Sequence, residues 1–112
     1  MAKTSKKTIK VVYNNKGQLA IKEVEAKKFD EVIIDDKIMT LYIHRDIQNN
    51  KRWMITDEAS GFFLKGDFKN TVDARKQYDE DLKDKLIDFI KNKYSQYLNA
   101  IKIFNDIVNN KN

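Results

Sequence analysis

Residues 52–67 read RWMITDEASGFFLKGD, and this stretch predicts the fold more directly than any other part of the chain. The apolar segment WMI precedes the polar loop TDEASG, and the apolar segment FFL follows it. Two apolar runs around a glycine-containing polar turn are typical of a β-hairpin. Because side chains alternate along a strand, Trp53 and Phe62 are expected in the core, whereas Met54 and Phe63 point the other way. Phe63 either packs under a second layer or faces outward to stack on a partner.

The segments before this hairpin have the pattern of further short strands. Residues 8–13 alternate, with Ile9, Val11 and Tyr13 on one face, and the turn sequence NNKG follows them. Further strands are expected at residues 18–24, 32–34 and 38–43, with a charged connector at 25–30 and a polar loop at 45–51. Together these segments predict an antiparallel meander of five or six strands over about residues 8–65.

From residue 70 onward the apolar residues follow helical spacing almost to the end of the chain. Asn70 or Thr71 can cap the helix, and Asp73 lies in the first turn, where the helix dipole favours an acid. One helix over 72–108 would be about 55 Å long at 1.5 Å per residue, whereas a six-residue strand spans only about 20 Å. We therefore expect one long or two shorter helices over about 71–108, with the best break at 78–81 and weaker ones at Asn92 or Asn99.

These elements predict an α+β fold in which the helices pack on one face of the sheet. Residues 1–7 form a flexible basic arm that contains Lys3, Lys6 and Lys7, and residues 8–112 form one domain. The helix end either caps the sheet or extends past it to bind another chain, which allows a homodimer through the C-terminal helix. The candidate protein-binding residues are Tyr94, Tyr97, Ile101 and Phe104.

Length and composition exclude several classes of protein. A chain of 112 residues with 41% hydrophobic residues can bury one modest core. The absence of cysteine excludes disulfides and a catalytic thiol. The longest apolar runs are far shorter than the roughly 20 residues that span a bilayer, and the basic N-terminus lacks the apolar stretch of a signal peptide. We expect a cytoplasmic protein with no membrane partner.

The charge points toward nucleic acid, but its composition offers another explanation. The net charge is +5 and the isoelectric point is near 9.3, which suits a phosphate-binding surface. Only three of the 22 basic residues are arginine, and the chain is also rich in asparagine, so lysine and asparagine together are typical of an AT-rich genome. The candidate nucleic-acid-binding residues are Lys10, Lys22, Arg52 and Lys65, with Tyr42 and Phe63 as stacking aromatics.

Catalytic chemistry has little support in the sequence. His44 is the single histidine, and we expect it on the surface at the end of a strand. The chain has no nucleophile-elbow, zinc-protease or phosphate-loop motif. The acidic pairs Asp35-Asp36 and Asp57-Glu58 suit turns, and the run at 79–81 suits helix capping. We expect no enzyme activity, no cofactor and no metal.

One pattern around the hairpin resembles known proteins. Trp53-x-Ile55-Thr56, Gly61, Gly66-Asp67 and Ala74 resemble a strand–turn–strand–helix module found in small phage, plasmid and conjugative-element proteins of low-GC Gram-positive bacteria. The arm-binding domain of some integrases is similar in outline. The resemblance covers about residues 52–76 and implies an accessory protein of a mobile element. Such proteins include DNA-binding relaxation or excision factors and inhibitors of host defences such as anti-CRISPR proteins.

Two functions remain open, and they predict different surfaces. An accessory factor that binds DNA or RNA needs its basic residues together on one exposed sheet face with an aromatic among them. A small inhibitor or adaptor that binds a host nucleic-acid enzyme, as an anti-CRISPR protein does, needs an uncovered apolar helix end or an acidic loop face. The acidic candidates for that face are Asp35, Asp36, Asp57 and Glu58.

Overall fold

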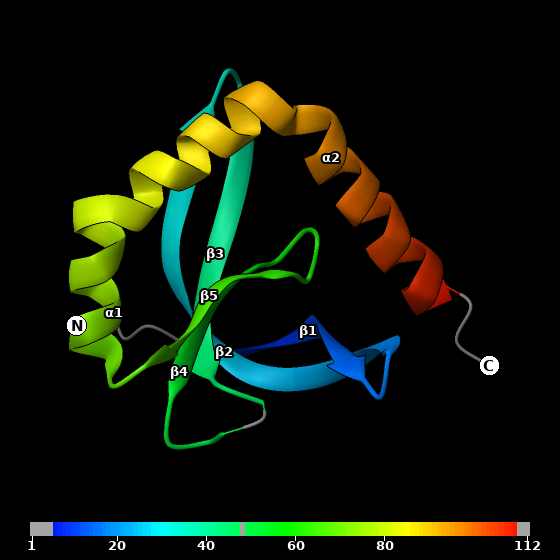
Figure 1. Ribbon diagram of the computed structural model, residues 1–112, viewed down its shortest axis with the longest axis horizontal. Coiled ribbons are helices and arrows are strands. Elements are labelled where there is room, and N and C mark those ends of the chain that lie inside the picture. Colours follow the sequence, from blue (N-terminus) through cyan, green and yellow to red (C-terminus); the bar gives the residue numbers. More distant parts are fainter. Residues whose placement is uncertain (1–5, 48, 110–112) are drawn as a thin grey trace.

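A computed structural model describes residues 6–47 and 49–109 and confirms the α+β fold (Figure 1). Its elements are β1 (Lys6–Asn15), β2 (Gln18–Ile34), β3 (Lys37–Arg45), β4 (Trp53–Asp57), β5 (Phe63–Phe68), α1 (Thr71–Gln77) and α2 (Lys83–Asn109). A π-helical turn, Tyr78–Leu82, joins the two helices. Within the predicted basic arm, Lys6 and Lys7 belong to β1, and Lys3 lies outside the described residues.

The described strands form an antiparallel meander in the order β1-β2-β3-β4-β5. Strand β2 has 17 residues and pairs with two strands: its first part pairs with β1 and its last part with β3. The predicted connector at 25–30 and separate strand at 32–34 are therefore wrong. The charged residues there face solvent while Val24 and Ala26 continue the alternation on the other face, so the strand runs through.

A bulge in β2 places Phe29 against the π-helical turn that joins the two helices. The register with β3 shifts between Lys28 and Asp30, which leaves Phe29 as the extra residue. Its ring is buried and lies edge-on to Tyr78 with 5.0 Å between ring centres. Around this pair, one face of the sheet and the inner side of the helices form the helix-side core, which includes Val32, Ile34, Met39, Leu41, Ile43, Ile55, Leu86 and Ile90.

The opposite face of the sheet carries a smaller second core made by Ile9, Val11, Ala26 and Tyr42. The sheet curls around it, so that the free edge of β1 reaches the connection between β4 and β5. There the amide of Val12 donates to the carbonyl of Gly61 at 2.7 Å. The curl gives this small chain two buried layers from one sheet.

The helical region shows the expected start and one sharp kink. The side chain of Asn70 accepts from the amide of Asp73 at 2.7 Å, as an N-cap should. The break predicted over 78–81 does not occur, because the chain passes through the π-helical turn with Gln77, Tyr78 and Lys83 all at right-handed helical angles. Lys93, beside Asn92, has non-helical angles (φ −133°, ψ 37°) and kinks α2. The helix therefore arches over the sheet (Figure 1), and its end packs back on Gly61 through the buried Phe104.

Candidate functional site

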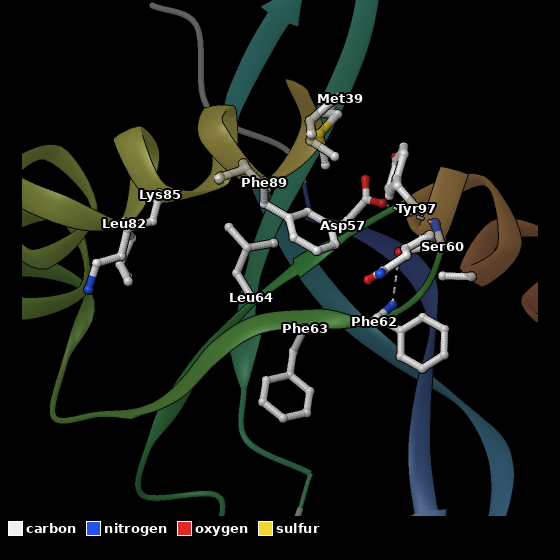
Figure 2. A pocket seen from close by; sticks show the side chains of 14 residues that line it. Met39, Asp57, Ser60, Phe62, Phe63, Leu64, Leu82, Lys85, Phe89 and Tyr97 are labelled. Atoms are coloured by element: carbon white, nitrogen blue, oxygen red, sulfur yellow. Dashed lines mark hydrogen bonds between the residues drawn. The ribbon is translucent and has the colours of Figure 1, made fainter. Parts of the chain in front are cut away.

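An apolar groove lies between the sheet and the kinked helix α2. It encloses about 510 Å³, within the range of pockets that hold small organic molecules. The sheet side includes Met39, Ser60 and Leu64, and the helix side includes Phe89 and Ala100. Figure 2 shows Met39 of β3, Leu64 of β5 and Phe89 of α2 converging on the groove. The kink at Lys93 creates the groove, because a straight helix could not follow the sheet on both sides of it.

The floor of the groove carries an acid, Asp57, at the end of β4. Its side chain is 2% exposed, its Oδ2 accepts from the amide of Ser60 at 3.2 Å, and its Oδ1 has no hydrogen-bond donor of good geometry among the described residues. Burial raises the pKa of Asp57, although the nearby Tyr97 hydroxyl and the Ser60 donors favour its charged form. Burial, with the Asp57 charge beside it, also raises the pKa of Tyr97, so the phenol stays neutral.

A second feature is the tip of the β2–β3 hairpin. Ile33 and Ile38 are direct cross-strand partners on the face away from the helices, and they are 72% and 61% exposed. The turn between the strands consists of Asp35 and Asp36, with φ of 49° and 68°. Two successive residues in the left-handed region form a tight hairpin turn that asparagine and glycine usually occupy. The tip thus presents two uncovered apolar side chains beside two acids.

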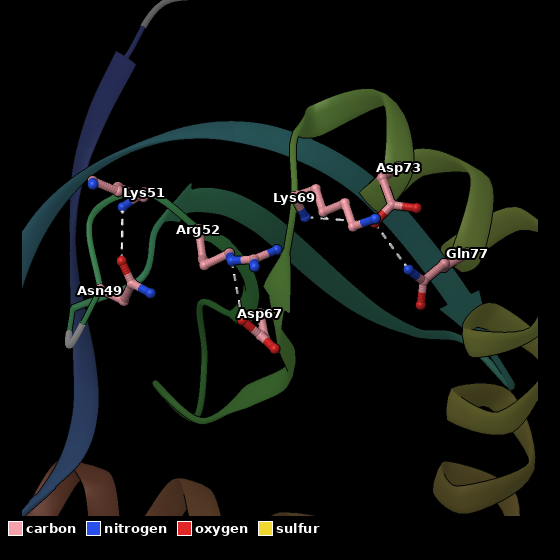
Figure 3. Close-up of polar contacts among 7 residues, drawn as sticks. All are labelled: Asn49, Lys51, Arg52, Asp67, Lys69, Asp73 and Gln77. Carbon is pink, nitrogen blue, oxygen red and sulfur yellow. Dashed lines mark hydrogen bonds and ion pairs between the residues drawn. The ribbon is translucent and has the colours of Figure 1, made fainter.

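The basic residues expected on one sheet face do not come together. Lys10 pairs across from Glu23, and Lys22 pairs across from Val11, so these two lysines point to opposite faces of the β1–β2 ribbon. The Nζ of Lys65 donates to Gln77 on α1 at 3.0 Å. Arg52 lies 3.4 Å from Asp67 in an ion pair (Figure 3).

The other two arginines also bind within the chain. The Arg45 guanidinium lies 4.2 Å from the Trp53 ring centre and donates to the carbonyl of Asn50. The Arg75 guanidinium lies 3.9 Å from the Phe29 ring centre and donates to the Phe29 carbonyl at 2.7 Å. Arginine is the side chain that binds phosphate with two donors. Because these guanidinium groups already make contacts within the chain, they are less available to bind the phosphates of a nucleic acid.

The remaining candidates lie at different depths. Phe63 is 53% exposed and lines the groove mouth, whereas Tyr42 belongs to the second core and its ring is covered. Tyr94 and Ile101 are half-buried residues of α2, and Lys37 Nζ lies 4.7 Å from the Tyr94 ring centre. The predicted acidic face is also divided, since Asp35 and Asp36 form the hairpin tip while Asp57 is buried in the groove.

His44 is buried, not on the surface as the sequence predicts. Its Nδ1 donates to the carbonyl of Arg45 at 2.8 Å, and its Nε2 accepts from the Thr56 hydroxyl at 2.7 Å. Burial lowers the pKa of His44 and keeps the ring neutral. Strand alternation could have predicted this burial, because His44 lies on the same face of β3 as Tyr42, and Tyr42 belongs to the second core.

Sequence reasoning assigns Asp57 to a turn and misses its place in the groove. Trp53, Ile55 and Asp57 alternate along β4, so the same period that predicts a buried Ile55 also predicts an acid that faces the core. The groove itself has no sequence signal, because the kink that forms it arises at Lys93 without a proline or glycine.

The chain was compared with protein families, curated proteins and solved structures, and nothing in the three comparisons matches it. Among the described residues, no helix has both the length and the apolar character to cross a membrane.

Proposed function

We propose that this chain is a non-catalytic binding protein that engages a protein partner through the tip of the β2–β3 hairpin. The observation that carries the proposal is the pair Ile33 and Ile38, which are large, directly opposite each other and uncovered. Contiguous apolar side chains on a polar protein mark interaction sites more often than isolated ones do. Burying both would supply an apolar centre for an interface.

The acids at the tip define the chemistry of the partner. Asp35 and Asp36 stand at the turn, and Glu31 lies on the same face as Ile33, with Lys28 as its ion-pair partner at 2.7 Å. An apolar surface with a basic rim complements this arrangement. Clefts that hold nucleic acid are basic, so the partner class that fits is a nucleic-acid-processing protein. This is the inhibitor or adaptor function that the resemblance to mobile-element proteins implies, and both remain proposals.

Direct binding of nucleic acid is the second candidate, and one observation favours it. Lys6 and Lys27 are direct cross-strand partners at the end of the β1–β2 ribbon. Like charges in this position repel each other and destabilise a sheet, whereas a polyanion would relieve the repulsion. The internal use of all three arginines weighs against this candidate.

The test compares protein capture by three immobilised forms of the chain from a lysate of low-GC Gram-positive bacteria. The forms are the native chain, a tip variant with Ile33→Ser and Ile38→Ser, and a control with Leu19→Ser and Val72→Ser. The control removes exposed apolar side chains of similar number away from the tip. We expect at least one protein that the native chain and the control retain and the tip variant loses.

A second arm measures fluorescence anisotropy with labelled DNA and RNA at increasing salt concentration. In the capture experiment, equal retention of proteins by the native chain, the tip variant and the control would overturn the proposal. Tight nucleic-acid binding that weakens steeply with salt, and that is lost in a Lys6→Glu, Lys27→Glu variant, would replace it with the second candidate.

A further inference from the structure

We propose that the groove under the kinked helix binds a small organic ammonium ion with an apolar body, with the Asp57 carboxylate as its counter-ion. This inference concerns the opposite face of the sheet from Ile33 and Ile38, and it does not depend on the hairpin tip.

The ammonium group is inferred from the state of Asp57. Its Oδ1 is buried without a good donor, and Asp57 forms no ion pair within the described part of the chain. A buried carboxylate is costly unless a donor or a cation satisfies it. The one lysine that lines the groove, Lys85, has its Nζ 2.9 Å from Asp81 outside it. No cation of the described residues therefore pairs with Asp57, and an ammonium group that enters the groove would be its charged partner.

The apolar body is inferred from the walls. Around the acid, the groove is built from aliphatic and aromatic side chains that include Leu86, Phe89 and Ile90. Figure 2 shows the Phe89 ring on one side of the Asp57 carboxylate and Tyr97 on the other. A hydrated inorganic cation would leave these walls in contact with water, and an anion would meet the acid at the floor. An amine attached to a ring or a short chain would place its charged group on the acid and its apolar part against the walls.

The polar groups at the floor can orient the ligand. Ser60 already donates its amide to Oδ2 of Asp57, so Oδ1 is the open acceptor. The neutral Tyr97 hydroxyl lies beside it and can accept a second hydrogen bond from an ammonium group. Charge-assisted hydrogen bonds of this kind contribute more than neutral ones.

The experiment uses three probes of nearly equal size: naphthylmethylamine, naphthalenemethanol and naphthoate. Binding to the full chain is followed by amide chemical-shift changes in NMR spectra at neutral pH. We expect shifts at Ser60, Phe89 and Ala100, and affinity for the amine at least about tenfold above that for the alcohol. The naphthoate should bind more weakly than either.

Two variants and a control separate the role of the Asp57 charge from the role of the apolar walls. Asp57→Asn keeps the shape and should reduce the preference for the amine about tenfold, to near that for the alcohol. Ala100→Phe fills the groove and should abolish binding of both. Asp36→Asn removes one acid at the hairpin tip, where asparagine also accepts the positive φ, and should leave all three affinities unchanged.

The titratable groups that line the groove are Asp57 from β4 and Lys85 and Tyr97 from α2. Amine affinity should fall as the pH is lowered and Asp57 becomes protonated, and it should not fall in Asp57→Asn. Equal affinity for the three probes, or an unchanged preference for the amine in Asp57→Asn, would overturn the inference. Shifts that map away from the groove would overturn it as well.

Discussion

A Cβ atom built on Gly61 would lie 2.5 Å from Cε1 of Phe104, so the β4–β5 connection and the last helix meet with no room for a side chain. The same position approaches a methyl group of Val12 at 3.1 Å. Gly61 also has φ of 70°, in the region that favours glycine. This contact holds the second half of α2 against the curled sheet.

Replacing Gly61 with alanine should therefore destabilise the protein strongly. The left-handed conformation costs about 1–2 kcal/mol for a residue with a Cβ, and overpacking against Phe104 adds about 1–3 kcal/mol. We expect the free energy of unfolding, measured by urea denaturation, to fall by about 2–5 kcal/mol.

Gly17 provides the matched control, because its φ is 87° and nothing lies within 4 Å of its Cβ position. Gly17→Ala should show only the backbone cost of about 1–2 kcal/mol. Equal losses in the two variants would show that Phe104 does not press on Gly61 in solution.

The hairpin tip should gain stability when its turn receives the residues that the geometry favours. Asp35 and Asp36 both have positive φ, and the sequence Asn-Gly fits this turn better than Asp-Asp. We expect the double variant Asp35→Asn, Asp36→Gly to be about 1 kcal/mol more stable, seen as a higher midpoint of thermal unfolding.

The same variant should retain less of the protein partner, because it removes two acids from the proposed interface. A gain in stability with a loss of binding would show that the turn sequence serves recognition. Lower stability would contradict the assignment of the turn geometry.

The parts of the fold that follow from local pattern are the parts that sequence predicts well. The alternation of Ile9 and Val11, the hairpin around residues 56–61 and the cap at Asn70 each depend on neighbouring residues, and the structure has all three. The predicted split of β2 into two strands is wrong, because the charged residues at 25–30 have the composition of a connecting loop. In the structure they are the solvent side of a strand whose other side is buried.

The candidate groove was beyond sequence reasoning because it depends on long-range packing. The spacing of Tyr97 and Phe104 predicts a helix face, but only the kink at Lys93 turns that face back onto the sheet. Likewise, lysines close in sequence, such as those at 10 and 22, separate to opposite faces once the strand register is known.

His44 should make the protein less stable in mild acid. Burial holds the pKa of His44 below its usual value of about 6.5. The unfolded chain therefore binds a proton at a pH where the folded chain does not, and the free energy of unfolding falls as the pH drops from about 6.5 toward the folded pKa. His44→Gln should remove this slope in urea denaturation between neutral and mildly acidic pH.

Thr56→Val tests the hydrogen bond that His44 receives. The hydroxyl of Thr56 is the donor to Nε2, and valine leaves this buried nitrogen without a partner at nearly the same volume. We expect a loss of about 1–3 kcal/mol in the free energy of unfolding. A loss below about 0.5 kcal/mol would indicate that the bond contributes less than a typical one.

Two aspartates should give opposite pH dependences. Burial tends to raise the pKa of Asp30, but the hydroxyl of Tyr78 at 2.7 Å, the backbone at Glu31 and the charge of Lys83 outweigh it and lower the pKa. Its stabilising contribution is present above the unfolded value of about 3.9 and is lost as the pH falls through the folded pKa. Asp30→Asn should therefore reduce the free energy of unfolding at neutral pH.

Asp57 has the reverse sign, because burial raises its pKa above that of the unfolded chain. Between the two values the folded state binds more protons, so the free energy of unfolding falls as the pH rises from about 3.9 to the folded pKa. At higher pH the charged carboxylate remains a cost. Asp57→Asn should therefore be more stable than the native chain at neutral pH, since its amide oxygen can still accept from Ser60.

Urea denaturation of the native chain, Asp30→Asn and Asp57→Asn across the acidic to neutral range checks both signs at once. If the groove binds an ammonium ion, the native chain should gain stability on addition of naphthylmethylamine, whereas Asp57→Asn should gain much less. The cost of the unpaired acid in the free protein would then be the feature that favours a cation. A native chain that is more stable than Asp57→Asn at neutral pH without ligand would show that the carboxylate is already satisfied within the fold.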